Sequence, residues 1–461
     1  MPIIGAYTVP HPPLIVPDIG KGAEEQIIET TNAYKQVAKE IATLKPETII
    51  ITSPHTVLYG DYFHISPNDN AYGDFSNFNA SNVKFNEEYD TELVNEIEKL
   101  AKQYSFPMGT SHERDKVLDH GVMVPLYFIR QELPKCKIIR VGLSSLPLVD
   151  NYRAGEIIQE AVNNLNKRVV FVASGDLSHK LQTYGPYGFI DEGPIYDEQI
   201  MKTLSTGAFN ELLEYKESFL DKAAECGHRS FTIMAGALDG IEVESKQLSH
   251  QDITGVGYGI CTFYPQGENT NRKFRELYLE KERKRLENKA NNSNDYIKLA
   301  YKTINKYIKD KEVLKVPNDI NKELLDNQKG VFVTLNKFDQ LRGCIGTFLP
   351  TRDNIAEEII SNSISSATSD YRFNKVTEDE LPYLDISVYL LNEPEQIDDQ
   401  NELDPKKYGV IVSSGYKRGL LLPDLDGIDT IEEQLRIAKN KGNITDSDEI
   451  QLERFTVTKY E

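Results

Sequence analysis

The sequence predicts an α/β domain with a largely parallel central sheet flanked by helices, followed by a separate α+β domain. The chain has 461 residues, which is more than one hydrophobic core normally organises. Short apolar stretches alternate with amphipathic ones in the first half, as strands and crossover helices do. A polar, charged stretch then separates this half from a second pattern of strands and helices. Together these observations predict two domains.

Five β-branched, apolar runs are the expected strands of the first domain, and amphipathic runs between them are the expected helices. The strands are Ile3–Val9, Thr48–Ser53, Lys137–Leu143, Arg168–Ser174 and Gly257–Tyr264. The helices are Ala23–Leu44, Asn86–Tyr104, Val122–Leu133, Ala154–Leu165 and Tyr196–Glu214. Strands that are apolar along their whole length are typical of parallel sheets covered on both faces.

The domain boundaries follow from composition. We place the first domain at residues 1–265, a charged linker at 266–294 and the second domain at 295–461. Asn271–Asn292 is dense in Lys, Arg and Glu of mixed sign, which favours a solvated helix or connector over a nucleic-acid tether. The α+β elements expected beyond it are helices near 296–308, Ile355–Thr368 and Thr430–Lys439 and strands at Gly330–Leu335, Asp385–Leu391, Gly409–Ser413 and Gly419–Leu422.

Charge and hydropathy exclude several classes of function. The formal net charge of -20 argues against general nucleic-acid binding, which needs a basic surface. No segment approaches the ~20 apolar residues that span a bilayer, and we see no signal peptide. The four cysteines lie far apart, without a C-x-x-C pair. We therefore expect a cytoplasmic protein that contacts neither nucleic acid nor membrane.

Histidine is confined to the first domain, where all eight residues of this type precede position 251. His11, His55 and His179 each follow the carboxyl end of an expected buried strand. In open α/β sheets these ends converge on the ligand-binding crevice. We therefore expect the three imidazoles to share one site, whereas His64, His112, His228 and His250 are expected in loops or at the surface.

The local sequence around these histidines indicates a mononuclear metal site. Prolines precede both His11 and His55 and stiffen their loops. Glu225 would complete the two-histidine, one-carboxylate set that suits Fe(II). The neighbouring Cys226 is a softer ligand that would favour copper or zinc. His120, just before an expected helix, is a further candidate for the site.

The order of these motifs resembles the class III extradiol dioxygenases of the LigB superfamily. The resemblance rests on His11, His55, the D-H-G-x-x-V-P-L element from Asp119 to Leu126 and the S-G-D-L-S-H element from Ser174 to His179. It implies that His11, His55 and Glu225 hold Fe(II), that His179 and His120 act as acid/base and substrate-orienting groups, and that the substrate is a small, oxygen-rich, catechol-like molecule. The chain would then be an oxidoreductase that incorporates molecular oxygen.

The stretch Glu225-Cys226-Gly227 is also similar to the Memo proteins, in which a cysteine joins two histidines at the metal. This likeness leaves the third ligand open between Glu225 and Cys226. It also implies an alternative function, a metal-binding accessory protein without turnover of its own. A zinc-dependent hydrolase is a third option, because His and carboxylate ligands suit zinc.

The second domain resembles the AMMECR family. The likeness is carried by Leu341-Arg342-Gly343-Cys344-Ile345-Gly346 and by Asp370-Tyr371-Arg372-Phe373, where Tyr371 replaces the usual proline. This domain contains no histidine, so a Cys–His dyad at Cys344 is excluded within it. We expect a separate concavity around Cys344, in which Arg342 and Arg372 bind an anionic group or form ion pairs.

The succession of the two domains resembles the AmmeMemoRadiSam system protein A type of fusion. In such systems the third component is a separate radical-SAM protein. This chain lacks the C-x-x-x-C-x-x-C motif that holds the cluster of such a protein. The resemblance therefore implies a radical-SAM partner that acts in trans.

Overall fold

The computed structural model describes residues 2–425 and 427–461, which fold as two compact units, Met1–Leu279 and Glu280–Glu461. The division falls within helix α9, Phe274–Asn292, in the charged segment that the sequence assigns to a linker. Among the described residues, no helix combines the length and hydrophobicity needed to cross a bilayer.

The first unit is built on a six-stranded sheet with the order β7-β2-β8-β1-β10-β9. The strands β7, β2, β8 and β1 are parallel to their neighbours, and β10 and β9 add an antiparallel edge. This confirms the predicted α/β class. The bounds are β1 Ile3–Val9, β2 Thr48–Ser53, β7 Lys137–Gly142, β8 Val169–Ser174, β9 Ile241–Gln251 and β10 Tyr258–Glu268.

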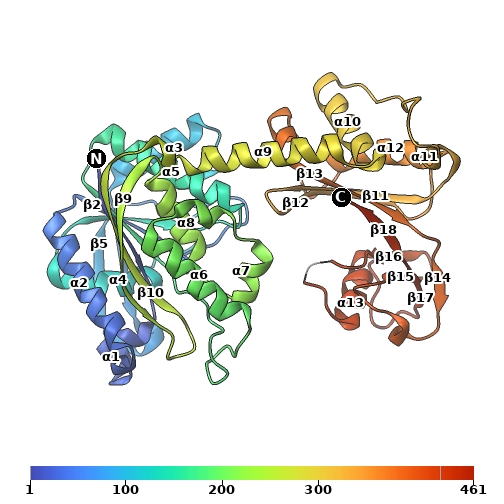
Figure 1. Cartoon of the computed structure of the whole chain (residues 1–461). Helices are drawn as coiled ribbons and strands as arrows, with labels where there is room; N and C mark the ends of the chain where they lie inside the picture. Colours follow the sequence, from blue (N-terminus) through green and yellow to red (C-terminus); the bar gives the residue numbers. More distant parts are fainter. Residues whose placement is uncertain (1, 426) are drawn as a thin grey trace. The chain divides into compact units, whose positions relative to one another are not determined.

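Helices cover both faces of this sheet (Figure 1). Helices α2 and α4 pack on one face, and α3, α5, α6 and α8 pack on the other, so the unit has two separate hydrophobic clusters. The bounds are α2 Ile28–Leu44, α3 Thr91–Gln103, α4 His120–Glu132, α5 Leu148–Leu165, α6 Glu192–Thr206 and α8 His228–Ala237. Shorter elements are α1 Pro17–Gly20, α7 Glu217–Ala223, the pair β3 Phe63–His64 and β6 Met108–Gly109, and the hairpin β4 Asn70–Phe75 and β5 Ala80–Glu88.

The predicted helices of the first unit differ from the observed ones at their ends; α5, for example, begins at Leu148 and not at Ala154, and two further differences have a clear physical cause. The run Asn86–Tyr104 starts as strand β5, because it pairs with β4, and helix α3 begins only after Asp90, whose carboxylate accepts from the Leu93 N–H. The run Tyr196–Glu214 is interrupted at Gly207, which adopts a left-handed φ of 67° and ends α6. A 3-10 helix, Phe209–Leu213, follows.

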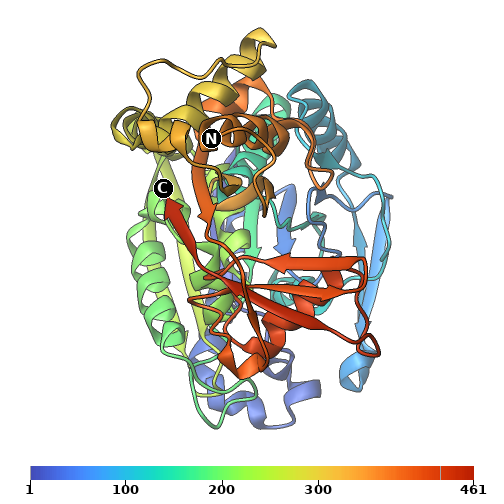
Figure 2. The same ribbon diagram turned by 90° about the vertical axis from the view of Figure 1, so that its right-hand side faces the viewer.

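The second unit is α+β, as predicted, and contains two four-stranded sheets. One sheet, β12-β11-β13-β18, is covered by α10 and α12, and the other, β14-β17-β15-β16, by α13 (Figure 2). The bounds are α10 Asp295–Asp310, α11 Lys322–Asp326, β11 Gly330–Lys337, β12 Gln340–Thr347, α12 Ile355–Thr368, β13 Leu384–Leu391, β14 Glu395–Ile397, β15 Gly409–Ser414, β16 Lys417–Leu421, α13 Ile431–Lys441, β17 Gln451–Phe455 and β18 Val457–Tyr460.

Candidate metal centre

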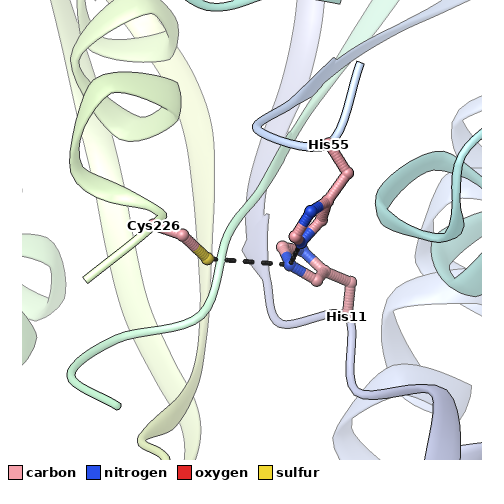
Figure 3. A group of neighbouring side chains, drawn as sticks. All are labelled: His11, His55 and Cys226. Atoms are coloured by element: carbon pink, nitrogen blue, oxygen red, sulfur yellow. Dashed lines mark hydrogen bonds between the residues drawn. The ribbon is translucent and has the colours of Figure 1, made fainter. Parts of the chain in front are cut away.

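Two histidines and one cysteine of the first unit bring ligand atoms to one point (Figure 3). His11 follows β1 and His55 follows β2, and their Nε2 atoms lie 2.9 Å apart. The Sγ of Cys226, just before α8, lies 3.6 Å from Nε2 of His11. Two bonds of about 2.1 Å to one ion leave their donor atoms roughly 3 Å or more apart, so this spacing fits a metal ion.

The tautomer of His11 suits a metal ligand. The Ser174 hydroxyl donates to the Gly121 carbonyl at 2.6 Å, so the 2.9 Å contact between Ser174 Oγ and His11 Nδ1 uses the Nδ1 proton. The Nε2 lone pair of His11 therefore points at His55 and Cys226. Burial lowers the pKa of His11 well below its ordinary value, which keeps this ring neutral. A hydrogen bond at the other ring nitrogen is the usual support of a metal-binding histidine.

Cys226 and Glu225 differ in what they face. The Glu225 carboxylate turns to the start of α8 and accepts from the His228 backbone N–H at 2.5 Å. Among the described residues, the donor groups close enough to share an ion include Cys226 and not Glu225. Burial raises the pKa of Cys226 well above its ordinary value, so its thiol keeps its proton unless a cation replaces it.

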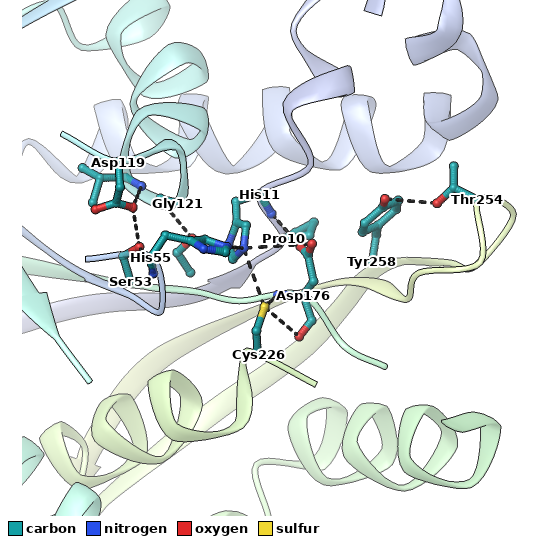
Figure 4. Close-up of polar contacts among 12 residues, drawn as sticks. Pro10, His11, Ser53, His55, Asp119, Gly121, Asp176, Cys226, Thr254 and Tyr258 are labelled. Atoms are coloured by element: carbon teal, nitrogen blue, oxygen red, sulfur yellow. Dashed lines mark hydrogen bonds and ion pairs between the residues drawn. The ribbon is translucent and has the colours of Figure 1, made fainter. Parts of the chain in front are cut away.

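Asp176 lies under the same site (Figure 4). Its Oδ1 accepts from the His11 backbone N–H at 2.8 Å, and its Oδ2 lies 4.0 Å from His11 Nε2. Burial raises the pKa of Asp176 to about 7. Ligand atoms of Asp176, His179 and Cys226 also lie within 4.8 Å of one another, so this carboxyl borders the metal-ligand cluster.

His120 and His179 complete the surroundings of the three donors. The ring centroid of His120 lies 3.9 Å from that of His55, while His179 stacks on Tyr187 at 5.2 Å. The buried Nε2 of His179 has no hydrogen-bond partner among the described residues. Burial and, second, the charge of His55 lower the pKa of both His120 and His179 to about 4. Both rings are therefore neutral near pH 7.

The other four histidines lie outside the cluster. The expectation that they occupy loops or the surface is wrong for His64 and His228, which are buried. His228 Nε2 contacts the Leu212 carbonyl at 2.9 Å, so this ring belongs to the packing of α8. His250 pairs with Asp197 at 3.1 Å, and His112 is exposed in a loop.

In the second unit, the residues singled out from the sequence are already engaged by partners. Arg342 pairs with Glu380 at 2.8 Å, and Arg372 pairs with Asp370 at 2.7 Å. The Cys344 thiol accepts from the Thr334 hydroxyl at 3.3 Å, and burial raises its pKa. Among the described residues, Cys344 belongs to no group of metal-ligand atoms. The sequence analysis allowed ion pairs for these arginines but named no partners; Asp370 lies in the same motif as Arg372, whereas no local motif couples Glu380 to Arg342.

The first unit is an α/β domain with a histidine-rich cluster at the ends of its parallel strands, and comparison with known proteins identifies the families of both units. Residues 5–261 match the family described as the catalytic LigB subunit of aromatic ring-opening dioxygenase, and residues 297–461 match AMMECR1. The chain belongs to the LigB family and carries an AMMECR1 domain behind its LigB domain.

Several known proteins are similar to this chain in sequence or structure. Protein CA_C1420 of Clostridium acetobutylicum is 40% identical over 469 residues, which cover 100% of this chain and 99% of that protein. A Thermotoga maritima protein is 50% identical over 167 residues, 36% of this chain and 96% of its own. Among solved structures, the uncharacterized protein PH0010 of Pyrococcus horikoshii is 32% identical, covers 36% of this chain and 88% of its own, and has a TM-score of 0.34. The uncharacterized protein JW3007 of Escherichia coli K12 is 14% identical, covers 56% and 99%, and has a TM-score of 0.41.

Proposed function

We propose that the LigB unit is a mononuclear oxidoreductase of the extradiol dioxygenase type that holds iron or copper through His11, His55 and Cys226. The observation that carries the proposal is the convergence of three ligand atoms within 4.8 Å beside two further histidines. Of the two candidates for the third ligand, Cys226 is the one whose ligand atom faces the histidines. A thiolate favours a softer ion than a carboxylate does, so copper competes with Fe(II) here.

The chemistry divides between the ion and the surrounding side chains. A bound redox-active ion would supply electron transfer between a small diol or enediol and molecular oxygen. The protein residues hold that ion, orient the substrate and move its protons. His179 presents an Nε2 without a partner among the described residues, so it can accept a proton from a substrate hydroxyl. His120, at the start of α4, lies against His55 and orients the substrate beside it.

The test is a pair of adjacent variants, Cys226→Ser and Glu225→Gln, in the full chain purified without oxygen. Each protein is supplied with Fe(II), Cu(I) and Zn(II) in competition, and metal content, the thiolate charge-transfer band and oxygen uptake with a catechol panel are recorded. We expect Cys226→Ser to lose the band and most of the bound metal, while Glu225→Gln retains both. The exposed-loop variant His112→Asn is the matched control.

Either of two results would contradict this assignment. If Glu225→Gln loses the metal and Cys226→Ser keeps it, the third ligand is the carboxylate. If only Zn(II) is retained and no substrate of the panel consumes oxygen, the redox function is wrong and hydrolysis becomes the better interpretation of the site.

A second candidate function is favoured by the same cysteine. A thiolate in place of the carboxylate is the feature that the sequence associates with a Memo-like accessory protein. In this role the unit would present its ion or substrate to a radical-SAM protein without turnover of its own. Stoichiometric metal binding without oxygen uptake, together with co-purification of such a partner, is the outcome that would favour it.

A further inference from the structure

Arg140, on strand β7, is the largest fully buried side chain of the first unit, with 1% of its surface exposed. Burial of a guanidinium is costly unless its N–H groups are satisfied. Its Nε donates to the Ser66 hydroxyl, and its two terminal nitrogens donate to the carbonyls of Val117 and Asp115, each at 2.6 Å. Arg140 thus fixes the loop that leads into α4, whose first residue is His120.

The same guanidinium lies beside the carboxylate of Asp119, with 3.9 Å between Arg140 Nη1 and Asp119 Oδ2. This Oδ2 is buried and has no hydrogen-bond partner among the described residues. Arg140, which also lies 3.9 Å from Glu113, therefore supplies the neighbouring positive charge on the Oδ2 side of this carboxylate. A buried carboxylate without such compensation would be unfavourable in this environment.

Asp119 in turn connects two segments of the metal centre (Figure 4). Its Oδ1 accepts from the Val122 N–H at 3.2 Å, which caps α4 directly at His120. The same oxygen accepts from the Ser53 hydroxyl at 2.6 Å, and Ser53 Oγ accepts from the His55 backbone N–H at 3.2 Å. One carboxylate therefore holds both the His55 loop and the start of the His120 helix.

We propose that Arg140 is a positioning residue that acts through Asp119 to keep His55 in coordinating position and His120 beside it. The proposal rests on the proposed function, because it assumes that His55 binds the metal. Arg140 lies on β7, the edge strand, whereas His55 follows β2, so the link crosses from one strand to the next. Outer residues that orient metal ligands typically contribute about 10- to 100-fold to metal affinity.

The experiment measures Zn(II) affinity of the full chain by competition with a chromophoric chelator, and the absorption spectrum of the Co(II)-loaded protein. The variants are Asp119→Asn, Arg140→Lys, Arg140→Gln and the double variant Asp119→Asn/Arg140→Gln. Asparagine keeps the helix cap and removes the charge, so the Asp119→Asn protein tests the pair even where an Arg140 variant fails to fold. Arg130→Gln, which removes a part-buried arginine paired with Glu87, is the matched control.

We expect Asp119→Asn and Arg140→Gln each to weaken Zn(II) binding at least about tenfold and to shift the Co(II) spectrum. The double variant should be no weaker than the worse single variant, because both changes break one link. Arg140→Lys should recover part of the loss, and Arg130→Gln should bind as the unchanged chain does. A structural role alone would lower the melting temperature and leave the affinity of the folded protein unchanged.

The two levels of the inference fail in different ways. If the unchanged chain binds neither Zn(II) nor Co(II), the proposed metal function itself is wrong. If it binds them and Asp119→Asn binds within twofold of it, the positioning role of Arg140 is overturned. Additive losses in the double variant would likewise show that the two residues act independently.

Discussion

The polar clusters that the sequence singles out in the two units are arranged in opposite ways. In the LigB unit, imidazole and thiol donors converge on one point, and the buried Nε2 of His179 has no partner among the described residues. In the AMMECR1 unit, Arg342 and Lys337 close on Glu380, and Arg372 closes on Asp370. The donor atoms of the first cluster could be satisfied by a bound cation, whereas the charges of the second cluster are already neutralised by one another. The comparison indicates that histidines, cysteines and arginines singled out from a sequence form a ligand site only where the folded protein does not itself supply their hydrogen-bond or ion-pair partners.

The largest expected effect is loss of metal on removal of the central donor. His11→Ala should lower metal affinity by more than about 100-fold, because loss of a ligand should cost more than loss of an outer support. Metal content after dialysis, compared with His112→Asn, measures this. If the His11→Ala protein retained as much metal as the unchanged chain, the first unit would have no metal site at His11, and the difference proposed between the two units would be wrong.

The next effect concerns the ion pairs that Arg342 and Lys337 form with Glu380 in the second unit. Glu380→Gln leaves Arg342 and Lys337 without their carboxylate, so we expect a loss of about 2 kcal/mol in the free energy of unfolding at pH 7, a value reduced for solvent screening because the cluster is part-buried. Burial alone would raise the pKa of Glu380, but hydrogen bonds from Arg342 and Lys337 lower it to about 2. Metal binding by the first unit should not change.

The pH dependence of this effect follows from the lowered pKa. The stabilisation from Glu380 is present above its ordinary pKa of 4.5 and is lost as the pH falls toward 2. Urea denaturation of the two proteins at pH 7 and pH 3 should therefore show a difference that shrinks in acid. A difference that is constant with pH would show that the ion pairs do not cause it.

A buried carboxyl of the first unit should behave with the opposite sign. Burial raises the pKa of Asp239 from 3.8 to about 6, although Tyr152 and the Phe274 N–H donate to it. Its contribution is favourable below pH 3.8 and is lost as the pH rises through 6. Asp239→Asn should thus stabilise the unit at pH 7 by about 1 kcal/mol, a value reduced for solvent screening. At pH 4 the urea midpoints of the two proteins should nearly coincide; a less stable variant at pH 7 would contradict this.

The elements that are marked by a local hydrophobic pattern could be predicted from the sequence. The predicted and observed bounds agree for strand β1, Ile3–Val9, and for strand β2, Thr48–Ser53. Uninterrupted β-branched runs of this length favour a buried strand over a helix or loop. The hairpin of β4 and β5 was missed, since its pairing depends on a partner strand rather than on periodicity. Likewise, the sequence predicted the end of α6 poorly, because the C-cap at Gly207 and the 3-10 helix that follows it depend on the local backbone conformation.

Most of the candidate site could also be located, since strand-end histidines share an edge of the sheet. His11, His55 and His179 follow parallel strands and lie around Cys226 in the structure, and His120, at the start of α4, lies beside His11 and His55. The sequence could not predict which of the adjacent residues Glu225 and Cys226 faces the site. Their side chains point in different directions just before α8, and the backbone conformation there decides which one reaches the histidines. Arg140 was overlooked for a related reason: a lone arginine in a strand carries no motif.

The smallest expected effect comes from separating the units. Phe274 and Tyr278 of α9 pack against the hydrophobic core of the first unit. A fragment of residues 1–279 keeps these contacts, whereas one that ends at the sequence-predicted boundary of 265 loses them. Because the proposed ligands His11, His55 and Cys226 all lie within the first unit, the longer fragment should bind metal within about twofold of the full chain. Metal content and melting temperature of both fragments test this. A folded 1–279 fragment that loses its metal would show that the AMMECR1 unit supplies part of the site, and the division of chemistry between the units would have to be abandoned.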